Sequence, residues 1–127
     1  MPGAVELVAV AGGGAIGAVL RHLTGLAVHG LLGRGFPWGT LAVNLSGSLA
    51  MGLAYVLLAE RGLLPGAWRS FITVGLLGAF TTFSTFSLDT IALVGADAPA
   101  RAAAYVLASV GLCLLAAWLG ILLGRTL

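Results

Sequence analysis

The sequence predicts an all-α membrane protein with four transmembrane helices. Hydrophobic residues make up 60% of the 127 residues and charged residues only 8%, whereas a soluble domain carries roughly 25% charged residues. The few charges divide the chain into uncharged runs, three of which match the ~20 apolar residues that a spanning helix needs. The connecting segments are short and contain Gly and Pro, so they leave no room for a soluble domain.

The first helix is predicted at about residues 4–26. Its uncharged stretch ends at Arg21, so this arginine must lie near an interface or in a wet cavity. The glycines of "AVAGGGAIG" match the spacing of a dinucleotide-binding fingerprint, but the acidic residue that should follow is missing. We therefore interpret Gly13 and Gly17 as small residues that allow close packing between helices.

The second helix is predicted at about residues 37–59, because the chain is uncharged from Phe36 to Ala59. Asn44 lies about a third of the way along it. An asparagine in a membrane helix bonds a neighbouring helix or offers its NH₂ group to a passing species, and the sequence leaves both open. Asn44 also begins an N-glycosylation sequence, which would be out of reach within the membrane.

The third helix is predicted at about residues 68–95, with a break near 78–82. The stretch "GLLGAFTTFSTFSLD" (75–89) combines two glycines with five hydroxyl residues, which makes a poor continuous helix. Freed backbone inside a membrane must be buried in protein or line a wet cavity. Its carbonyls suit a small hard cation, and the hydroxyls suit an anion. Phe83 and Phe86 can offer positive ring edges to an anion, or they can simply pack.

The fourth helix is predicted at about residues 100–124. Tyr105, Ser109 and Cys113 recur every four residues and therefore share one face. Hydroxyls of this kind donate hydrogen bonds to a ligand or bond their own helix backbone. Gly120 and Gly124 predict another close helix contact.

The arginines give no preferred orientation in the membrane. With four spans, three fall on each side: Arg61, Arg69 and Arg125 on one, and Arg21, Arg34 and Arg101 on the other. The positive-inside rule therefore predicts no preferred orientation of the chain in the membrane. A partner or the first helix then sets the orientation, or the protein has dual topology and its copies insert both ways and pair antiparallel.

The composition argues against several other classes of protein. Paired carboxylates, a Ser/His/Asp set and a Cys/His cluster with metal-ligand spacing are all missing, so we do not expect an enzyme. The arginines are scattered singly, so we do not expect nucleic-acid binding. The N-terminus lacks a basic region, so we do not expect a cleaved signal peptide.

Taken together, these segments resemble the Fluc (CrcB) family of fluoride channels over nearly the whole chain. The stretches "GGGAIGAVLRH", "GTLAVNLSGSLAMG" and "GLLGAFTTFSTFS" carry the resemblance. It implies a fluoride-selective channel in the lipid bilayer of the cell inner (plasma) membrane. It also implies an antiparallel, dual-topology homodimer in which each copy pairs with a second copy of itself in the opposite orientation. Each dimer would have two pores and a central structural Na⁺.

The resemblance also implies roles for individual residues. The fluoride path would use the side chains of Phe83, Phe86, Asn44, Ser84, Thr85, Tyr105, Ser109 and Arg21. The backbone carbonyls of Gly78 and Thr81 from both copies would hold the Na⁺. This sequence differs from the family pattern at two positions. Ala79 stands where the family often has a second glycine in the break, and Cys113 stands where the polar face of the fourth helix can carry a hydroxyl residue.

Two other functions compete with this interpretation. A small dual-topology, proton-coupled multidrug exporter also has four helices, but it needs a carboxylate in the middle of the membrane. Glu6 lies at the start of the first helix and Asp89 late in the third. A non-conducting packing protein would explain the glycines and Asn44, but not "TTFSTF" beside a glycine break.

A passive channel needs only the membrane potential, worth ~2.3 kcal/mol per charge per 100 mV.

Overall fold

The computed structural model describes residues 1–127, and the chain forms four helical spans. The first span is α1 (Ala4–Leu32), and the second is α2 (Trp38–Ala54), which continues as the π-helical η1 (Tyr55–Glu60). The third consists of α3 (Gly66–Ser70), the π-helical η2 (Phe71–Leu77), α4 (Gly78–Phe80) and α5 (Phe83–Gly95), and the fourth is α6 (Pro99–Thr126). All four are long and apolar enough to cross a membrane. The predicted all-α, four-span fold is confirmed.

The first helix is longer than expected and ends at Leu32 instead of near residue 26. The chain beyond Arg21 is still weakly apolar and has no helix breaker until Gly33. There the backbone turns at φ 81, a conformation that glycine adopts without a steric penalty. Arg21 therefore lies within α1 and is half-buried.

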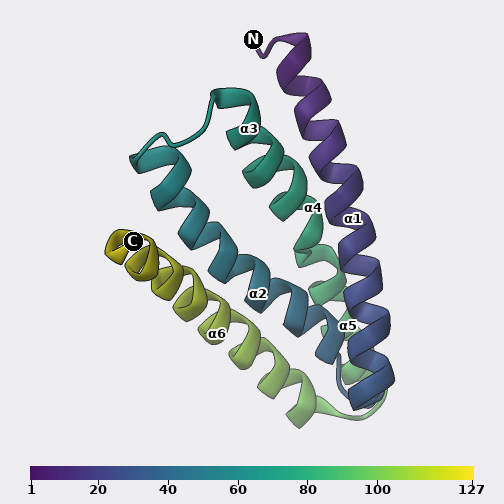
Figure 1. The fold of residues 1–127 in the computed structure, drawn as a ribbon. Coiled ribbons are helices and arrows are strands. Elements are labelled where there is room, and N and C mark those ends of the chain that lie inside the picture. Colours follow the sequence, from purple (N-terminus) through teal and green to yellow (C-terminus); the bar gives the residue numbers. More distant parts are fainter.

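The spans alternate in direction, as four consecutive crossings require. The N-terminus, the connection after η1 and the C-terminus lie toward one end of the molecule, and the other two connections lie toward the opposite end (Figure 1). At the first end, Arg125 forms an ion pair with Glu60, with 2.8 Å between nitrogen and oxygen. At the other, Arg101 donates a hydrogen bond to the Gly35 carbonyl at 3.3 Å. The arginines are therefore shared between both ends.

Glycines bring the helix backbones into direct contact. A Cβ at Gly13 would strike the Phe71 carbonyl, and one at Gly17 would strike the Leu76 carbonyl, so α1 lies tight against η2. On the other side, Gly120 of α6 packs on the backbone of α2 near Leu49. The close packing predicted for these glycines is confirmed, and it is how small residues hold membrane helices together.

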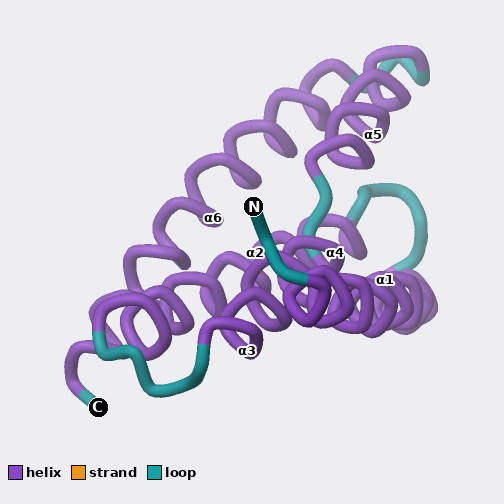
Figure 2. The backbone as a smooth tube through the Cα atoms, turned by 90° about the horizontal axis from the view of Figure 1, so that it is seen from above, coloured by secondary structure: helices purple, strands orange, loops and turns teal.

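The third span is broken at Thr81 and Thr82, inside the predicted range 78–82. Both residues are extended, with φ/ψ of −90°/158° and −153°/117°. The part before the break packs on α1, whereas α5 packs on α6, and Figure 2 shows the non-helical segment between α4 and α5. Asp97 is the only non-glycine residue with a positive φ, so the break does not require a glycine at Ala79.

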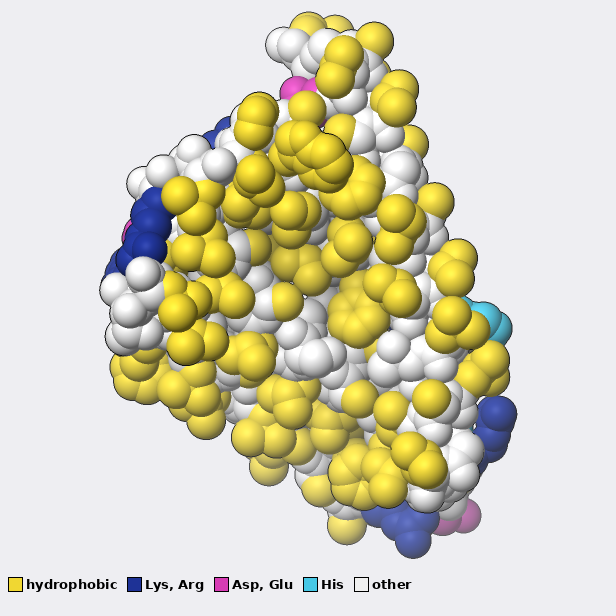
Figure 3. All heavy atoms as spheres, in the orientation of Figure 1, with side chains coloured by type: hydrophobic (Ala, Val, Ile, Leu, Met, Phe, Trp, Pro, Cys, Tyr) yellow, Lys and Arg dark blue, Asp and Glu magenta, His cyan; other side chains and the backbone are white.

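The outer surface of the chain is mostly apolar. In the face shown in Figure 3, hydrophobic side chains dominate and charged side chains lie at the margins. Only 11% to 33% of the most apolar window of each span is buried inside the chain. The rest is available to lipid or to another protein chain, and the molecule is a multi-pass membrane protein.

Candidate functional site

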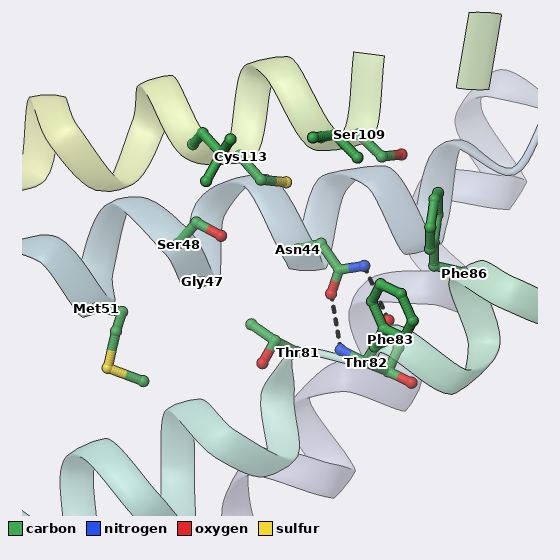
Figure 4. A pocket seen from close by; sticks show the side chains of 12 residues that line it. Asn44, Gly47, Ser48, Met51, Thr81, Thr82, Phe83, Phe86, Ser109 and Cys113 are labelled. Atoms are coloured by element: carbon green, nitrogen blue, oxygen red, sulfur yellow. Dashed lines mark hydrogen bonds between the residues drawn. The ribbon is translucent and has the colours of Figure 1, made fainter. Parts of the chain in front are cut away.

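The break in the third span is held open by Asn44 of α2. Its Nδ2 donates to the Thr82 carbonyl at 3.0 Å, and its Oδ1 accepts from the Thr82 N–H at 2.7 Å. In a continuous helix that N–H would bond the Gly78 carbonyl. The Asn44 amide thus takes the place of a helical partner (Figure 4). The Gly78 carbonyl is left without its usual donor. The Thr81 carbonyl accepts no hydrogen bond within the chain.

Thr82 also starts the next helix. Its Oγ1 accepts from the N–H of Thr85 at 3.2 Å, which is the usual way in which a threonine caps a helix N-terminus. The same hydroxyl donates to the Thr85 hydroxyl at 3.1 Å and lies 3.2 Å from that of Ser84. Three hydroxyl groups therefore meet where the backbone is broken.

A cavity of about 380 Å³ lies along the break, between α2, α5 and α6. We call it the neutral cavity, because none of its lining side chains is charged. It is lined by Asn44, Gly47, Ser48, Met51, Thr81, Thr82, Phe83, Phe86, Ser109, Val110, Cys113 and Leu114. In Figure 4, Asn44 of α2 reaches toward Thr82, and the rings of Phe83 and Phe86 lie next to each other on α5. The centroids of these rings are 5.4 Å apart.

A second hollow, of about 220 Å³, lies at the other side of Thr82. Its lining is Arg21, His22, Gly25, Leu26, His29, Arg34, Gly39, Thr40, Val43, Thr82 and Thr85. We call it the basic mouth, because two arginines and two histidines line it and no carboxylate does. Thr82 lines both spaces. The two hollows therefore share one lining residue, which lies in the break.

The predicted site residues divide between these two spaces. Asn44, Phe83, Phe86, Ser109 and Thr81 line the neutral cavity. Arg21 and Thr85 line the basic mouth. Ser84 and Gly78 are exposed on the single chain and line neither. The predicted roles of these residues in an ion path stay predictions, but the fold brings most of them to one continuous region around the break.

Tyr105 lies apart from both spaces, unlike its predicted neighbours on the polar face of α6. It is fully buried, with 0% of its surface exposed. Its hydroxyl donates to Asp89 at 3.0 Å, and Thr40 donates to the same carboxylate oxygen at 2.7 Å. Its ring lies 5.1 Å from that of Phe86. In this structure Tyr105 therefore packs against the Phe86 ring, and its hydroxyl proton is already donated to the Asp89 carboxylate.

Ser109, one turn further along α6, is free to donate. It is 6% exposed, and its Oγ is the only buried side-chain oxygen or nitrogen without a hydrogen-bond partner. A buried polar group without a partner costs stability unless something else meets it. Cys113 lines the same cavity one further turn along, and its thiol is a weaker donor.

Three residues that matter here were not predicted as site residues: Thr40, Thr82 and Asp89. Thr82 had a local signal, because threonine is among the preferred N-cap residues at the start of a helix. The pairing of Asp89 with Thr40 joins residues 49 positions apart. No local pattern reports such a contact, so only the fold reveals it.

The lining of the neutral cavity suits a small anion. Amide N–H, hydroxyl O–H and aromatic ring edges all present partial positive charge. A full positive charge in the same place would bind an anion too strongly to release it, and conduction requires release. The arginines of the basic mouth place full positive charges outside the neutral cavity, and charges of this sign raise the local concentration of anions.

This chain is similar in sequence to a known protein family and to several named proteins. The family model described as "CrcB-like protein, Camphor Resistance (CrcB)" matches residues 8–121. A protein of Magnetococcus marinus named "Fluoride-specific ion channel FluC" is 51% identical over 95% of this chain and 98% of its own length. Proteins with the same name from Chelativorans sp. and Agrobacterium fabrum are 50% and 46% identical, over 96% and 97% of this chain and 98% of each relative.

Proposed function

This chain belongs to the CrcB family, and on that premise we propose that it is a fluoride-selective channel that lets fluoride leave the cell passively. The observation that carries the proposal is the neutral cavity at the broken helix, which adjoins the basic mouth at Thr82. Relatives at about half identity over nearly their whole length bear the name of a fluoride-specific channel. The proposed location is the plasma membrane.

Fluoride is small and strongly hydrated, so its path must replace water with several hydrogen-bond donors. The neutral cavity offers the unpartnered Ser109 hydroxyl and the edges of the two phenylalanine rings, whereas the hydroxyls of Thr81 and Thr82 already donate to Leu77 and Thr85. One N–H of the Asn44 amide already donates to the Thr82 carbonyl, and this bond holds the donors in place. A larger halide, which keeps its water less tightly, gains less from such a lining, and this is the proposed basis of selectivity.

We propose that two copies pair antiparallel and that each dimer has two pores. Phe83 is 78% exposed on the single chain although it borders the cavity, and Ser84 and Gly78 are exposed beside it. A pore wall cannot face lipid hydrocarbon with free polar backbone. A second copy over the break would enclose these groups and complete the path.

A central Na⁺ fits the same arrangement. The Gly78 and Thr81 carbonyls have no helical donor, and two copies would bring four such oxygens together. Carbonyl oxygens of unwound backbone are ligands that Na⁺ accepts. When bound, the ion would join the two copies through charge at the contact. The proposal assigns it no role in moving fluoride.

The membrane potential drives the proposed export. A negative interior expels an anion with ~2.3 kcal/mol per charge per 100 mV, so no chemical step is needed and we expect no enzymatic activity. Undissociated HF enters a cell and ionises there, which supplies the fluoride to be expelled.

A growth assay tests this function in cells. Expression of the chain in a bacterium without its own fluoride exporter should restore growth in fluoride medium, and Phe83→Ile at equal expression should not. No rescue by the wild-type chain present in the membrane would contradict the proposal. The rival, a proton-coupled multidrug exporter, would instead protect against cationic dyes and depend most on Asp89. Its carboxylate is bonded by Thr40 and Tyr105 and lines neither space, and this does not favour the rival.

A further inference from the structure

The helix α2 carries a second polar residue toward the neutral cavity, and this residue is Ser48. It follows Asn44 by one helical turn, so the two side chains share one face of α2, and both line the neutral cavity. Serine hydroxyls in membrane helices commonly bond their own backbone, as that of Ser46 does with the Ala42 carbonyl at 2.7 Å. The half-buried Ser48 makes no such bond, so its hydroxyl proton remains free to serve the cavity.

Close packing sets the register between α2 and α6. The two helices run in the same direction, away from the end where the first and third connections lie (Figure 1). A Cβ at Gly52 would strike the Ala117 carbonyl, so the two backbones meet at these residues. One turn earlier on both helices, the same register brings Ser48 opposite Cys113. Figure 4 shows these two side chains next to each other, and the hydroxyl lies within reach of the thiol.

The polar residues of the two helices therefore lie at two levels along the neutral cavity. Asn44 and Ser109 form the level beside the break, and there the Ser109 hydroxyl is buried without a partner. Ser48 and Cys113 form the next level. A thiol is a weak donor, so Ser48 supplies the strong donor of this level. Met51, the next cavity residue of α2, has only a weakly accepting thioether.

We propose that Ser48 is a further residue of the fluoride path and donates its hydroxyl to the ion one turn beyond Ser109. This inference rests on the proposed channel function. An ion that has lost its water needs a new donor before it leaves the last one. Without Ser48, an ion that moves on from Ser109 would meet the Cys113 thiol as its only polar partner on these two helices at that level.

The contact between Ser48 and Cys113 does not prevent this role. Sulfur is a weak acceptor, whereas a hydrogen bond to an ionised group is roughly twice as strong as one between neutral groups. The hydroxyl can therefore turn from the thiol to an arriving anion at little cost. Because the donor is neutral, it holds the ion without the permanent charge that would oppose its release.

Fluoride efflux from liposomes that contain the purified protein, followed with a fluoride electrode, tests this role. Ser48→Ala should slow efflux by about tenfold, because one hydrogen bond to the moving ion is lost. Ser48→Thr keeps the hydroxyl and should retain most of the wild-type rate. Ser46→Ala is the matched control, because the Ser46 hydroxyl bonds carbonyls of its own helix, and it should conduct like wild type.

A second substitution separates donation to the ion from a purely structural role. Cys113→Ser in the Ser48→Ala background moves the hydroxyl from α2 to α6 at the same level, and it should restore most of the lost rate. Cys113→Ala alone should slow efflux less than Ser48→Ala, because only a weak donor is removed. If Ser48 only joined the two helices through the thiol, Cys113→Ala would be as slow as Ser48→Ala. Cys113→Ser would then restore nothing, because alanine at position 48 offers no partner.

Size-exclusion profiles and thermal unfolding show which variants are folded and assembled. A wild-type rate in Ser48→Ala, or a folded double variant that stays as slow as Ser48→Ala, would overturn the inference. Both results leave the proposed channel function intact, because fluoride release by the wild-type protein is its own readout. No fluoride release from folded wild-type protein would instead contradict the proposed function, and with it the inference that rests on it.

Discussion

At the scale of single residues, Asn44 has the largest structural consequence. One side-chain amide satisfies both the N–H and the carbonyl of Thr82. The sequence left open whether this asparagine joins helices or meets a passing ion. In the structure it joins α2 to the break, and by doing so it sets the shape of the cavity that would hold the ion. The two interpretations of the residue are therefore linked, because the proposed ion path depends on the break that Asn44 holds.

Asn44→Leu should abolish fluoride flux and lower stability. Two backbone groups at the break would lose their partners, and each buried polar group left unsatisfied costs about 1–3 kcal/mol. Thermal unfolding in detergent and flux from proteoliposomes measure the two effects. Ser46→Ala is the matched control, because the Ser46 hydroxyl bonds carbonyls of its own helix, and it should behave like wild type. Normal flux in Asn44→Leu would show that the break holds without the amide.

Phe83→Ile and Phe86→Ile should each stop fluoride flux while the protein stays folded and assembled. Isoleucine keeps apolar bulk but has no positive ring edge to offer an anion. Phe83 is 78% exposed on the single chain, so little packing within the subunit is lost. Flux and size-exclusion profiles are compared with those of Leu88→Val, which changes an exposed apolar residue on the same helix. Wild-type flux in a folded Phe variant would remove that ring from the path.

Arg21→Ala should reduce flux chiefly at low ionic strength. The arginine lines the basic mouth, and its field reaches about 10 Å at 0.1 M salt but only ~3 Å at 1 M. Flux is measured across this range beside Arg69→Ala, which changes an arginine at the opposite end of the molecule. A loss that is the same at all salt concentrations would mean that Arg21 acts through structure and not through its charge.

At the scale of elements, the break depends on a glycine opposite it. A Cβ at Gly47 of α2 would strike the Thr81 methyl group and come within 3.2 Å of the Phe80 ring. Gly47→Ala should therefore destabilise the protein by about 1–3 kcal/mol, as overpacking usually does, and should impair flux. The measurement is thermal unfolding of the purified protein.

Gly111→Ala is the control for this prediction. Gly111 lies within α6, and a Cβ there meets nothing within 4 Å. Alanine is the better helix former by about 0.5–1 kcal/mol, so this variant should be neutral or slightly stabilised. Equal unfolding temperatures for the two variants would mean that the break moves aside without loss.

The elements also show how far the sequence could be read. The four spans follow from where charges interrupt apolar runs, and the break follows from glycines and hydroxyls in one stretch. Both are local patterns. The two halves of the third span pack on different helices, α1 and α6, and the Asp89 carboxylate bonds donors from α2 and α6. These contacts join distant parts of the chain, so no local pattern contained them.

Tyr105 illustrates the same limit at the candidate site. Spacing placed it correctly on one face of a helix with Ser109, but spacing says nothing about what lies opposite each turn. The structure puts a carboxylate opposite Tyr105 and a cavity opposite Ser109. Likewise, the histidines of the basic mouth were plain in the sequence, but only the fold brings His29 against Gly39.

At the scale of the whole molecule, the single chain is an incomplete channel. Its neutral cavity borders a strongly exposed Phe83, and the freed carbonyl of Gly78 belongs to an exposed residue. The arginines are divided equally between the two ends, so neither orientation in the membrane is favoured. These features agree with the proposed antiparallel pair, which would cover the break and place one basic mouth toward each side of the membrane.

Fluoride efflux from liposomes that contain the purified protein tests the central claim most directly. Liposomes are loaded with equal fluoride and chloride, a potassium gradient with an ionophore sets the voltage, and an electrode for each anion records release. The account predicts rapid fluoride release that follows the voltage and needs no pH gradient, with chloride retained. Fluoride retained by folded, reconstituted protein, or chloride released at a similar rate, would contradict it.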